Sequence, residues 1–346
     1  AAAAARAVPA ERPAARPLIV LGAEDEAELA LVAPDAEEIW PLAPLQAGLL
    51  FQSTLDDDRG SDIYQGQWIL ELNGRWDVAR LRAAWEAVFA RHPALRLSFH
   101  RLASGKAVQA VAGHVTLPWR EVDLTGASDA DVAVEALARQ EQEKRFDLTK
   151  APLFRLVLAR LAEDRYRLVV VSHHILTDGW SVAVVLNEVS EAYTAGGRLP
   201  ERVDAASYRD YLAWLDRQDK DAARAAWRAE LDGIDVPALV AKTDSGTEYD
   251  YRVIHLPPEL HTRLIEFSRD HGLTLNTVVQ GAWAMVLARL VRRTDVVFGT
   301  TVATRPAELA GVESMPGLMM NTVPIRVPLD GGRTVVDMLT ALQDRQ

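Results

Sequence analysis

The 346-residue sequence contains no cysteine. This absence excludes disulfide bonds, a thiol nucleophile and cysteine-based metal sites, and a reducing cytoplasm fits such a protein best. Positive charge is also scarce, since 38 Lys and Arg residues stand against 49 Asp and Glu residues. The resulting net charge of −11 argues against a general attraction to nucleic acid or to anionic membranes. We therefore expect protein or small-molecule partners, with no nucleic acid and no membrane.

The N-terminal stretch, residues 1–16, lacks an apolar run long enough for a signal peptide or a membrane span. It is rich in alanine and contains prolines, so we predict a linker from a longer polypeptide over residues 1–35. The rest of the chain has the length of two lobes of roughly 150 residues each, which we assign to residues 36–203 and 204–346. With 49% hydrophobic and 25% charged residues, the composition is that of a soluble globular protein.

Hydrophobic periodicity predicts strands alternating with helices, and therefore a fold of the α/β (α+β) class. Asp77 and Thr274 precede helical patterns as N-caps, and further helices are expected over 208–231. The predicted strands cover residues 65–72, 95–100, 153–161, 166–172, 252–256 and 296–303. The strand over 166–172 is almost entirely apolar, which is typical of a central strand.

His173 and His174 directly follow that apolar strand, and an amphipathic helix begins after Asp178. Neighbouring side chains of an extended backbone point to opposite faces, so we expect one histidine to be catalytic and the other structural. Asp178 can cap the helix, and Gly179 allows a tight turn and a close approach of substrate to the backbone. A loop between rigid elements is a common position for catalytic residues.

Taken alone, the pair also fits two partly buried histidines beside an N-cap aspartate and a turn glycine. A metal site is disfavoured, because no further histidine or carboxylate has a ligand spacing such as HExxH. A Ser-His-Asp hydrolase is disfavoured too, because the sequence has no G-x-S-x-G elbow. The remaining chemical interpretation is a histidine base that acts directly on an acceptor.

The segment HHILTDGWS, residues 173–181, resembles the HHxxxDG motif of the condensation domains of nonribosomal peptide synthetases. Four further segments resemble motifs of this family in the same order along the chain. They are Trp40–Phe51 (the opening motif), Arg91–Phe99 (RHxxLRxxF), Tyr208–Trp214 (YxDYxxW) and Gly317–Pro324 (GxxxNTxP). The resemblance runs from about Trp40 to the last residue, and it implies that the chain stops before the final family motifs, with an incomplete second lobe.

The resemblance implies two chloramphenicol-acetyltransferase-like lobes in a V-shaped pseudo-dimer with a central tunnel. Upstream and downstream peptidyl carrier proteins would present thioesters on phosphopantetheine arms, beside an adjacent adenylation domain. No cofactor would be bound by the domain itself. The amine of the acceptor would attack the donor thioester, so that the domain is an amide-bond-forming acyltransferase of secondary metabolite biosynthesis. His174 corresponds to the key histidine, as a base or as a group that positions the amine.

The family pattern also implies roles around this histidine. His173, Asp178 and Gly179 complete the catalytic motif, and Arg96 is the expected ion-pair partner of Asp178. Backbone N–H groups at Gly179 and Trp180 could support an oxyanion.

Three further residues, Trp180, Ser181 and Asn321, are expected to line the tunnel, although Asn321 equally fits a strand-end turn. Core packing rather than ligand stacking is expected for Trp85, Trp214 and Trp283.

Other members of the same fold remain alternatives: an ester-forming acyltransferase, an epimerization or heterocyclization domain, and a condensation-like domain that only recruits partner proteins. The intact histidines and the Trp180-Ser181 continuation favour condensation over cyclization and epimerization. The form of the opening motif, PLQAGLLF over residues 44–51, resembles domains that accept a D-configured donor.

Overall fold

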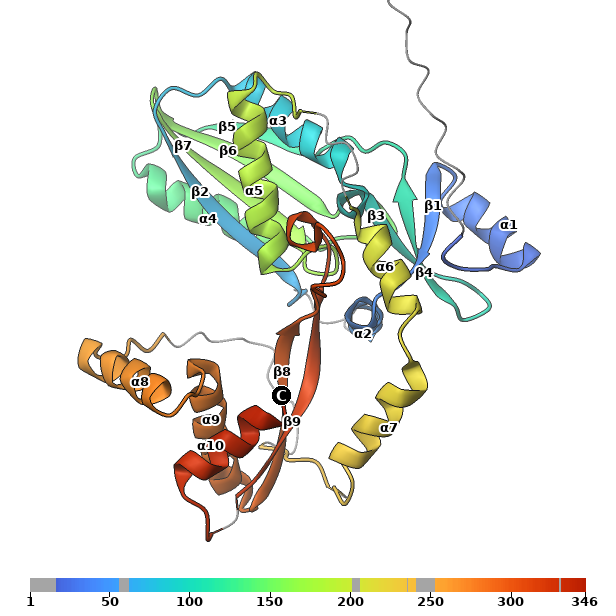
Figure 1. The fold of residues 1–346 in the computed structure, drawn as a ribbon. Helices are drawn as coiled ribbons and strands as arrows, with labels where there is room; N and C mark the ends of the chain where they lie inside the picture. The colour runs from blue at the N-terminus through green and yellow to red at the C-terminus, as the bar shows by residue number, and fades with distance from the viewer. Residues whose placement is uncertain (1–16, 56–61, 201–205, 235, 241–252, 330) are drawn as a thin grey trace, which may run out of the picture. The chain divides into compact units, whose positions relative to one another are not determined.

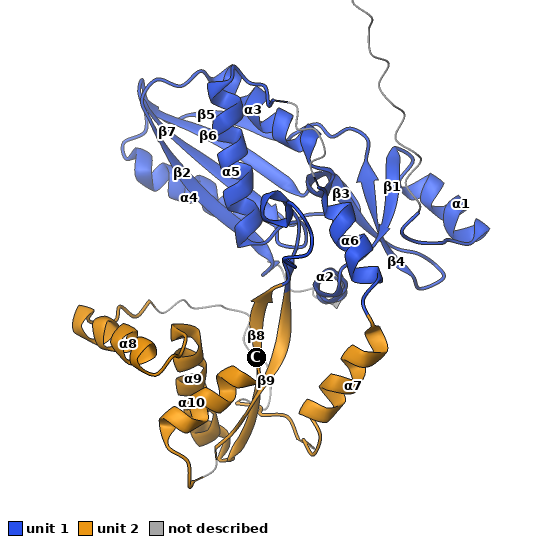
Figure 2. Cartoon of the chain, viewed as in Figure 1, with its two compact units in different colours: residues 1–218, 304–320 blue, residues 219–303, 321–346 orange. Residues whose placement is uncertain are grey.

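The structure, a computed structural model, describes residues 17–55, 62–200, 206–234, 236–240, 253–329 and 331–346 (Figure 1). The chain forms two compact units (Figure 2). Unit 1 comprises residues 1–218 and 304–320, and unit 2 comprises residues 219–303 and 321–346. The predicted lobe boundary between residues 203 and 204 lies outside the described residues, as do residues 1–16 of the predicted linker. Both assignments stay predictions.

Unit 1 contains two β-sheets with helices around them. Its strands are β1 (Ala36–Pro41), β2 (Gln65–Asn73), β3 (Leu97–Arg101), β4 (Ala107–Ala112), β5 (Trp119–Asp123), β6 (Phe154–Ala162) and β7 (Arg165–His173). Its helices are α1 (Ala23–Val32), α2 (Pro44–Leu55), α3 (Val78–Arg91), α4 (Ala130–Gln142), α5 (Gly179–Thr194) and α6 (Tyr208–Asp216), with the 3₁₀ turns η1 (Pro93–Arg96) and η2 (Val312–Ser314).

The larger sheet has the strand order β2-β7-β6-β5, so β7 is a central strand. Its side chains alternate between two hydrophobic clusters: Leu168 and Val170 contact α3 and α5, whereas Val169 and Val171 contact α4. Figure 1 shows α3 and α5 side by side on one face of the sheet and α4 on the other. Because both faces are covered, the middle of the strand, residues 168–171, is continuously apolar, in agreement with the apolar run in the sequence.

The smaller sheet has the order β1-β4-β3 and is antiparallel throughout. Helix α1 packs beside it through Leu29, which contacts Leu102 and Val108. Lys106 pairs with Asp25 of α1 at 2.9 Å. Part of the segment predicted as linker is therefore folded against this sheet.

Side-chain caps determine where several helices begin. Asp77 accepts a hydrogen bond from the backbone N–H of Arg80, and Thr274 accepts one from that of Thr277, as the sequence predicted. Asp129 caps α4 and Asp219 caps the helix over Lys220–Glu230 in the same way. Each cap satisfies N–H groups that have no partner inside the helix.

The described residues of unit 2 form a two-stranded sheet and four helices. These are β8 (Asp295–Ala303), β9 (Met320–Pro328), α7 (Lys220–Glu230), α8 (Pro258–Asp270), α9 (Leu275–Val291) and α10 (Val335–Asp344). Its core is small and centres on α9, α10 and the two strands. Among the helices within the described ranges, none has the length and apolar character needed to cross a membrane.

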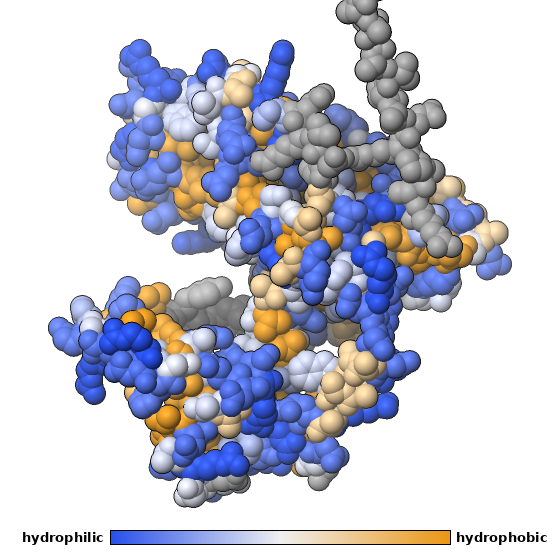
Figure 3. Space-filling view, viewed as in Figure 1, coloured by the Kyte–Doolittle hydropathy of each residue, from blue (hydrophilic) through white to orange (hydrophobic). Residues whose placement is uncertain are grey.

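Two expectations for unit 2 are wrong. Residues 253–257 form no strand, and Ile254 is 83% exposed; Arg252 lies outside the described residues. Trp283 is 46% exposed rather than packed in a core. It belongs to an apolar stripe on α9 with Val279, Val286 and Leu290, and Figure 3 shows apolar residues at the surface around α8 and α9. In unit 1, by contrast, Trp85 is fully buried, as expected.

Candidate functional site

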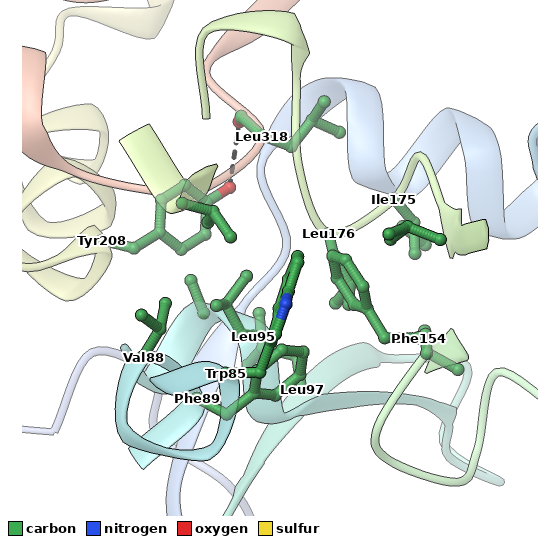
Figure 4. Close-up of a cluster of buried hydrophobic side chains, with 14 of the residues drawn as sticks. Trp85, Val88, Phe89, Leu95, Leu97, Phe154, Ile175, Leu176, Tyr208 and Leu318 are labelled. Carbon is green, nitrogen blue, oxygen red and sulfur yellow. Dashed lines mark hydrogen bonds between the residues drawn. The ribbon is translucent and has the colours of Figure 1, made fainter. Parts of the chain in front are cut away.

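The candidate site is the loop of residues 174–178, which joins the end of β7 to the start of α5. Ile175 and Leu176 are fully buried within this loop. Their side chains join the hydrophobic cluster that also holds Trp85 and Phe154 (Figure 4). The two apolar residues therefore anchor the loop, and the polar residues on either side of them are held in defined positions.

His173 is fully buried, and both of its ring nitrogens have partners. Nδ1 accepts a hydrogen bond from the backbone N–H of Ile175 at 3.1 Å, so this nitrogen carries no proton. Nε2 therefore carries the proton and donates to Oδ2 of Asp62 at 3.0 Å. Burial, the largest single influence, raises the pKa of Asp62, but the hydrogen bonds from His173 and from the backbone N–H of Tyr64, together with nearby positive charge, outweigh it and the pKa is lowered overall. With both nitrogens engaged, His173 supports the loop.

His174 has the opposite tautomer. Its Nδ1 lies 2.7 Å from the carbonyl oxygen of Thr177, which can only accept a hydrogen bond, so Nδ1 carries the proton. In the neutral ring Nε2 is then unprotonated, and within the described residues it contacts no hydrogen-bonding partner. The backbone N–H of His174 donates to the carbonyl of Tyr64 at 2.8 Å. The ring is half-buried and is oriented with a free lone pair on Nε2.

Asp178 caps α5, as the sequence predicted. Its Oδ1 accepts the backbone N–H of Ser181 at 2.8 Å, and its Oδ2 accepts the backbone N–H of Met319 at 3.1 Å. Arg305 donates Nη2 to the two carboxylate oxygens at 3.0 and 3.2 Å. Both side chains of this ion pair are only 7% exposed. The carboxylate is saturated with donors, which favours a structural role over proton transfer.

The predicted partner of Asp178 was Arg96, and this prediction is wrong. Arg96 ends the 3₁₀ turn η1 beside the end of β4, where its Nη1 donates to the carbonyls of Ala112 and Gly113. Arg305 instead belongs to residues 304–320, the segment that returns from unit 2 to unit 1. Little in the sequence indicated this role for Arg305, which merely follows the predicted strand over residues 296–303 by two residues.

Arg305 also holds its own segment together. Its Nη1 donates to the carbonyls of Val312 and Met315 at 2.7 and 3.0 Å. The guanidinium lies 5.5 Å from the ring centre of Trp180, within the range of a cation–π contact. One side chain thus connects the motif loop to the returning segment.

Ser181 is fully buried, and its hydroxyl contacts Asp178 Oδ1 at 2.6 Å and the carbonyl of Gly317 at 2.7 Å. The expectation that it lines a substrate path is corrected, because its hydroxyl is enclosed by these groups. Gly317 has a φ of 156°, and a Cβ there would lie 2.2 Å from the Tyr208 ring. The glycine of the predicted GxxxNTxP motif is therefore required by this close approach.

The other predicted site residues differ in their surroundings. Gly179 is the first residue of α5 and has no left-handed φ, so a tight turn does not require it; a Cβ there would meet nothing within 4 Å. Trp180 is 52% exposed, and its Nε1 donates to the carbonyl of Glu313 at 2.7 Å. Asn321 is the second residue of β9 and belongs to unit 2, and its Oδ1 accepts the backbone N–H of Thr322. This local bond fits the strand-end alternative for Asn321.

Two further observations limit what the site can hold. In the part of the chain that the structure describes, no group of three or more His, Asp or Glu side chains could ligate a metal ion. A small cavity of about 20 Å³ lies beside the motif loop, lined by Thr177 and by apolar side chains of β2, β6, β7, α3 and α5. The group that the loop offers for chemistry is the imidazole of His174, oriented by the hydrogen bond from Nδ1 to the carbonyl of Thr177.

The chain matches the family described as Condensation domain over residues 36–346. It is 34% identical over 316 residues to bacitracin synthase 1 of Bacillus licheniformis, covering 89% of this chain and 6% of the relative. It is 32% identical over 316 residues to tyrocidine synthase 3 of Brevibacillus parabrevis, covering 88% of this chain and 5% of the relative. The chain thus spans only a small part of these relatives.

Solved structures with similar folds point the same way. The first condensation domain of the calcium-dependent antibiotic synthetase, in complex with a substrate analogue, is 21% identical with a TM-score of 0.72, over 90% of this chain and 74% of the other. The X-domain from teicoplanin biosynthesis is 28% identical with a TM-score of 0.71, over 88% and 69%. These likenesses confirm the predicted chloramphenicol-acetyltransferase-like α/β fold. The V-shaped arrangement and its tunnel stay predictions.

Proposed function

The chain belongs to the condensation-domain family, and from this premise we propose that it forms peptide bonds on a nonribosomal peptide assembly line. Condensation domains are acyltransferases that make amide bonds. In this chain the donor would be a peptidyl or aminoacyl thioester, and the acceptor would be the amine of a carrier-bound aminoacyl thioester. The observation that carries the proposal is the free Nε2 of His174, held by the hydrogen bond from Nδ1 to Thr177.

This geometry supports a role for His174 as a base or as a group that orients the amine. An α-amino group has a pKa of about 8, so part of it is already reactive at neutral pH. An unprotonated Nε2 can accept a hydrogen bond from that amine and direct its lone pair toward the thioester carbonyl. When nitrogen attacks, the amine loses a proton to Nε2, the C–N bond forms, and the thiolate leaves as the tetrahedral intermediate collapses.

The remaining motif residues would assist indirectly. His173 and Asp178 hold the loop, and the open space at Gly179 leaves room for substrate. The backbone N–H groups of Gly179 and Trp180, at the first turn of α5, could stabilise the oxyanion.

The expected partners follow from the reaction. Upstream and downstream peptidyl carrier proteins would deliver both substrates on phosphopantetheine arms, next to an adenylation domain. No cofactor would reside on the domain itself. The relatives named above are synthases many times longer than this chain, which supports such neighbours. The form of the opening motif in α2 supports a D-configured donor.

Two alternatives can be tested against this proposal. The likeness to the X-domain from teicoplanin biosynthesis, which is described in a complex with OxyB, favours a domain that recruits another protein. The intact and well-oriented His174 favours catalysis. An ester-forming acyltransferase would show the same histidine but would accept a hydroxyl in place of an amine.

The test is a single-turnover reaction between two loaded carrier proteins, with the full-length protein as catalyst and intact-mass detection of the product. We expect peptide-bond formation, and we expect His174→Ala to lower its rate by at least roughly 10²-fold at unchanged carrier affinity. His261→Ala, in the exposed face of α8, is the matched control and should retain the wild-type rate.

Full activity of His174→Ala would remove the catalytic assignment. Product formation only with a hydroxyl acceptor would favour the ester-forming alternative, and no product with either acceptor would favour recruitment.

A further inference from the structure

Two glutamine side chains are completely buried beneath the motif loop. Gln46 lies in α2 and Gln109 lies in β4, and both are 0% exposed. Burying an amide without hydrogen-bond partners costs about 1–3 kcal/mol in proteins, so a pair of buried glutamines needs a specific set of partners. The sequence does not indicate a role for either side chain, because glutamine is neutral and is not a typical catalytic residue.

The two amides form one connected network. Gln46 Oε1 accepts the backbone N–H of Ala43 at 2.9 Å, which orients the amide group. Its Nε2 then donates both hydrogens, one to Gln109 Oε1 at 3.1 Å and one to the carbonyl oxygen of Ile175 at 3.1 Å. Gln109 Nε2 donates in turn to the carbonyl of Pro41 at 2.7 Å. The Gln46 amide thus uses its oxygen and both of its N–H hydrogens.

One of these bonds ends inside the motif loop. Ile175 is the residue after His174, and its carbonyl lies in the turn that closes at Thr177, the group that orients the His174 ring. Several groups hold the loop: Asp62 acts through His173, the Tyr64 carbonyl accepts the backbone N–H of His174, Arg305 acts through Asp178, and Gln46 binds at the centre of the loop. The bond from Gln46 is a side-chain contact to the turn between His174 and Thr177, which carries the catalytic candidate.

We infer that Gln46 is a positioning residue for His174, an inference that rests on the proposed function. The hydrogen bond from Gln46 holds the Ile175 carbonyl in place and so stabilises the turn from His174 to Thr177. This turn determines the orientation of the His174 ring and the position of its Nε2. Gln109 supports Gln46 without touching the loop. The two residues therefore stabilise the fold in similar ways but differ in their effect on the chemistry.

Gln46→Met tests this inference, since methionine keeps the length and apolar volume of the side chain and removes the amide. Misplacement of a reacting group by about 1 Å can lower a rate by up to about 10²-fold. We expect Gln46→Met to lower kcat by about 10-fold or more, to leave KM for the carrier substrates unchanged, and to shift the pH–rate profile that His174 governs. We expect Gln109→Met to lose similar stability with a much smaller change in kcat.

A matched control is Gln67→Met, which removes the 2.6 Å bond from the Gln67 amide to the carbonyl of Ala138, away from the motif loop. It should retain the wild-type kcat. Should Gln46→Met fail to fold, Gln46→Asn keeps a buried amide but is too short to reach both Ala43 and Ile175, and it should show the same drop in kcat.

The possible outcomes distinguish a failure of the positioning role from a failure of the proposed function. An inactive wild-type protein would overturn the proposed function. An active wild type with equal kcat losses in Gln46→Met and Gln109→Met, or with no loss in either, would overturn the positioning role while leaving the proposed function intact. A nitrogen-detected NMR spectrum of the His174 ring gives a readout without turnover: the signal of protonated Nδ1 should change in Gln46 variants and persist in Gln67→Met.

Discussion

The buried ion pair between Asp178 and Arg305 allows a quantitative prediction. Both side chains are 7% exposed, so neither charge can be solvated when its partner is removed. Breaking such a pair costs about 3–5 kcal/mol, because an uncompensated charge stays buried. In Arg305→Ala, Asp178 keeps its bonds from the N–H groups of Ser181 and Met319, so we expect a loss in unfolding free energy near 3 kcal/mol, at the lower end of that range.

Asp178→Ala should cost more. It removes the N-cap of α5, which is worth about 1 kcal/mol, and leaves the Arg305 cation buried. The double variant should lose less than the sum of the two single variants, since no unpaired charge remains.

Urea unfolding followed by tryptophan fluorescence measures these changes, and seven of the nine tryptophans belong to unit 1, which contains the pair. Arg75→Ala is the control, because its ion pair with Glu163 is 81% and 71% exposed and should contribute almost nothing. A loss below about 1 kcal/mol in Arg305→Ala, or strict additivity in the double variant, would refute this account of the pair.

Two further predictions concern stability. Burial lowers the pKa of His100, despite the opposing charge of Asp147, so protonation favours the unfolded chain. The free energy of unfolding should therefore decrease as pH falls below 6.5, the ordinary pKa of histidine. In unfolding experiments from pH 8 to 5, His100→Gln should remove this pH dependence. Gly317→Ala should lower the unfolding free energy by about 1–3 kcal/mol, since its Cβ would meet the Tyr208 ring. Gly74→Ala is the control: nothing lies near the new Cβ, but the φ of 99° remains, so this variant measures backbone strain alone. Equal losses of unfolding free energy in the two variants would show that the ring contact is unimportant.

Local patterns allowed the motif loop to be predicted. A strand buried on both faces reads as a continuous apolar run, and a capping aspartate lies next to the helix that it caps, so β7 and Asp178 were found within one short window. The alternation of side chains along a strand predicted that His173 and His174 would differ, and their opposite tautomers agree with that division.

Contacts between distant residues could not be predicted in this way. Arg305 lies 127 positions after Asp178, and Gln46 lies 129 positions before Ile175. No periodicity connects such residues, because the fold alone brings them together. The family pattern offered Arg96 for the ion pair, but its geometry directs the guanidinium to carbonyls at the end of β4. On α9, apolar spacing predicted a helix correctly but did not identify the buried face, where Gln280 and Thr277 are enclosed while Trp283 is exposed.

The returning segment, residues 304–320, has a consequence for anyone who recombines such proteins. A cut after residue 218 leaves a continuous piece that looks like a whole unit, yet it omits Arg305 and Met319, two of the groups that bind the Asp178 carboxylate. In a chimera joined at this boundary, the residues at positions 305 and 319, which must donate hydrogen bonds to Asp178, come from the other protein. Its compatibility can therefore be judged before cloning, by asking whether the incoming sequence supplies an arginine that reaches Asp178 and a glycine that clears Tyr208.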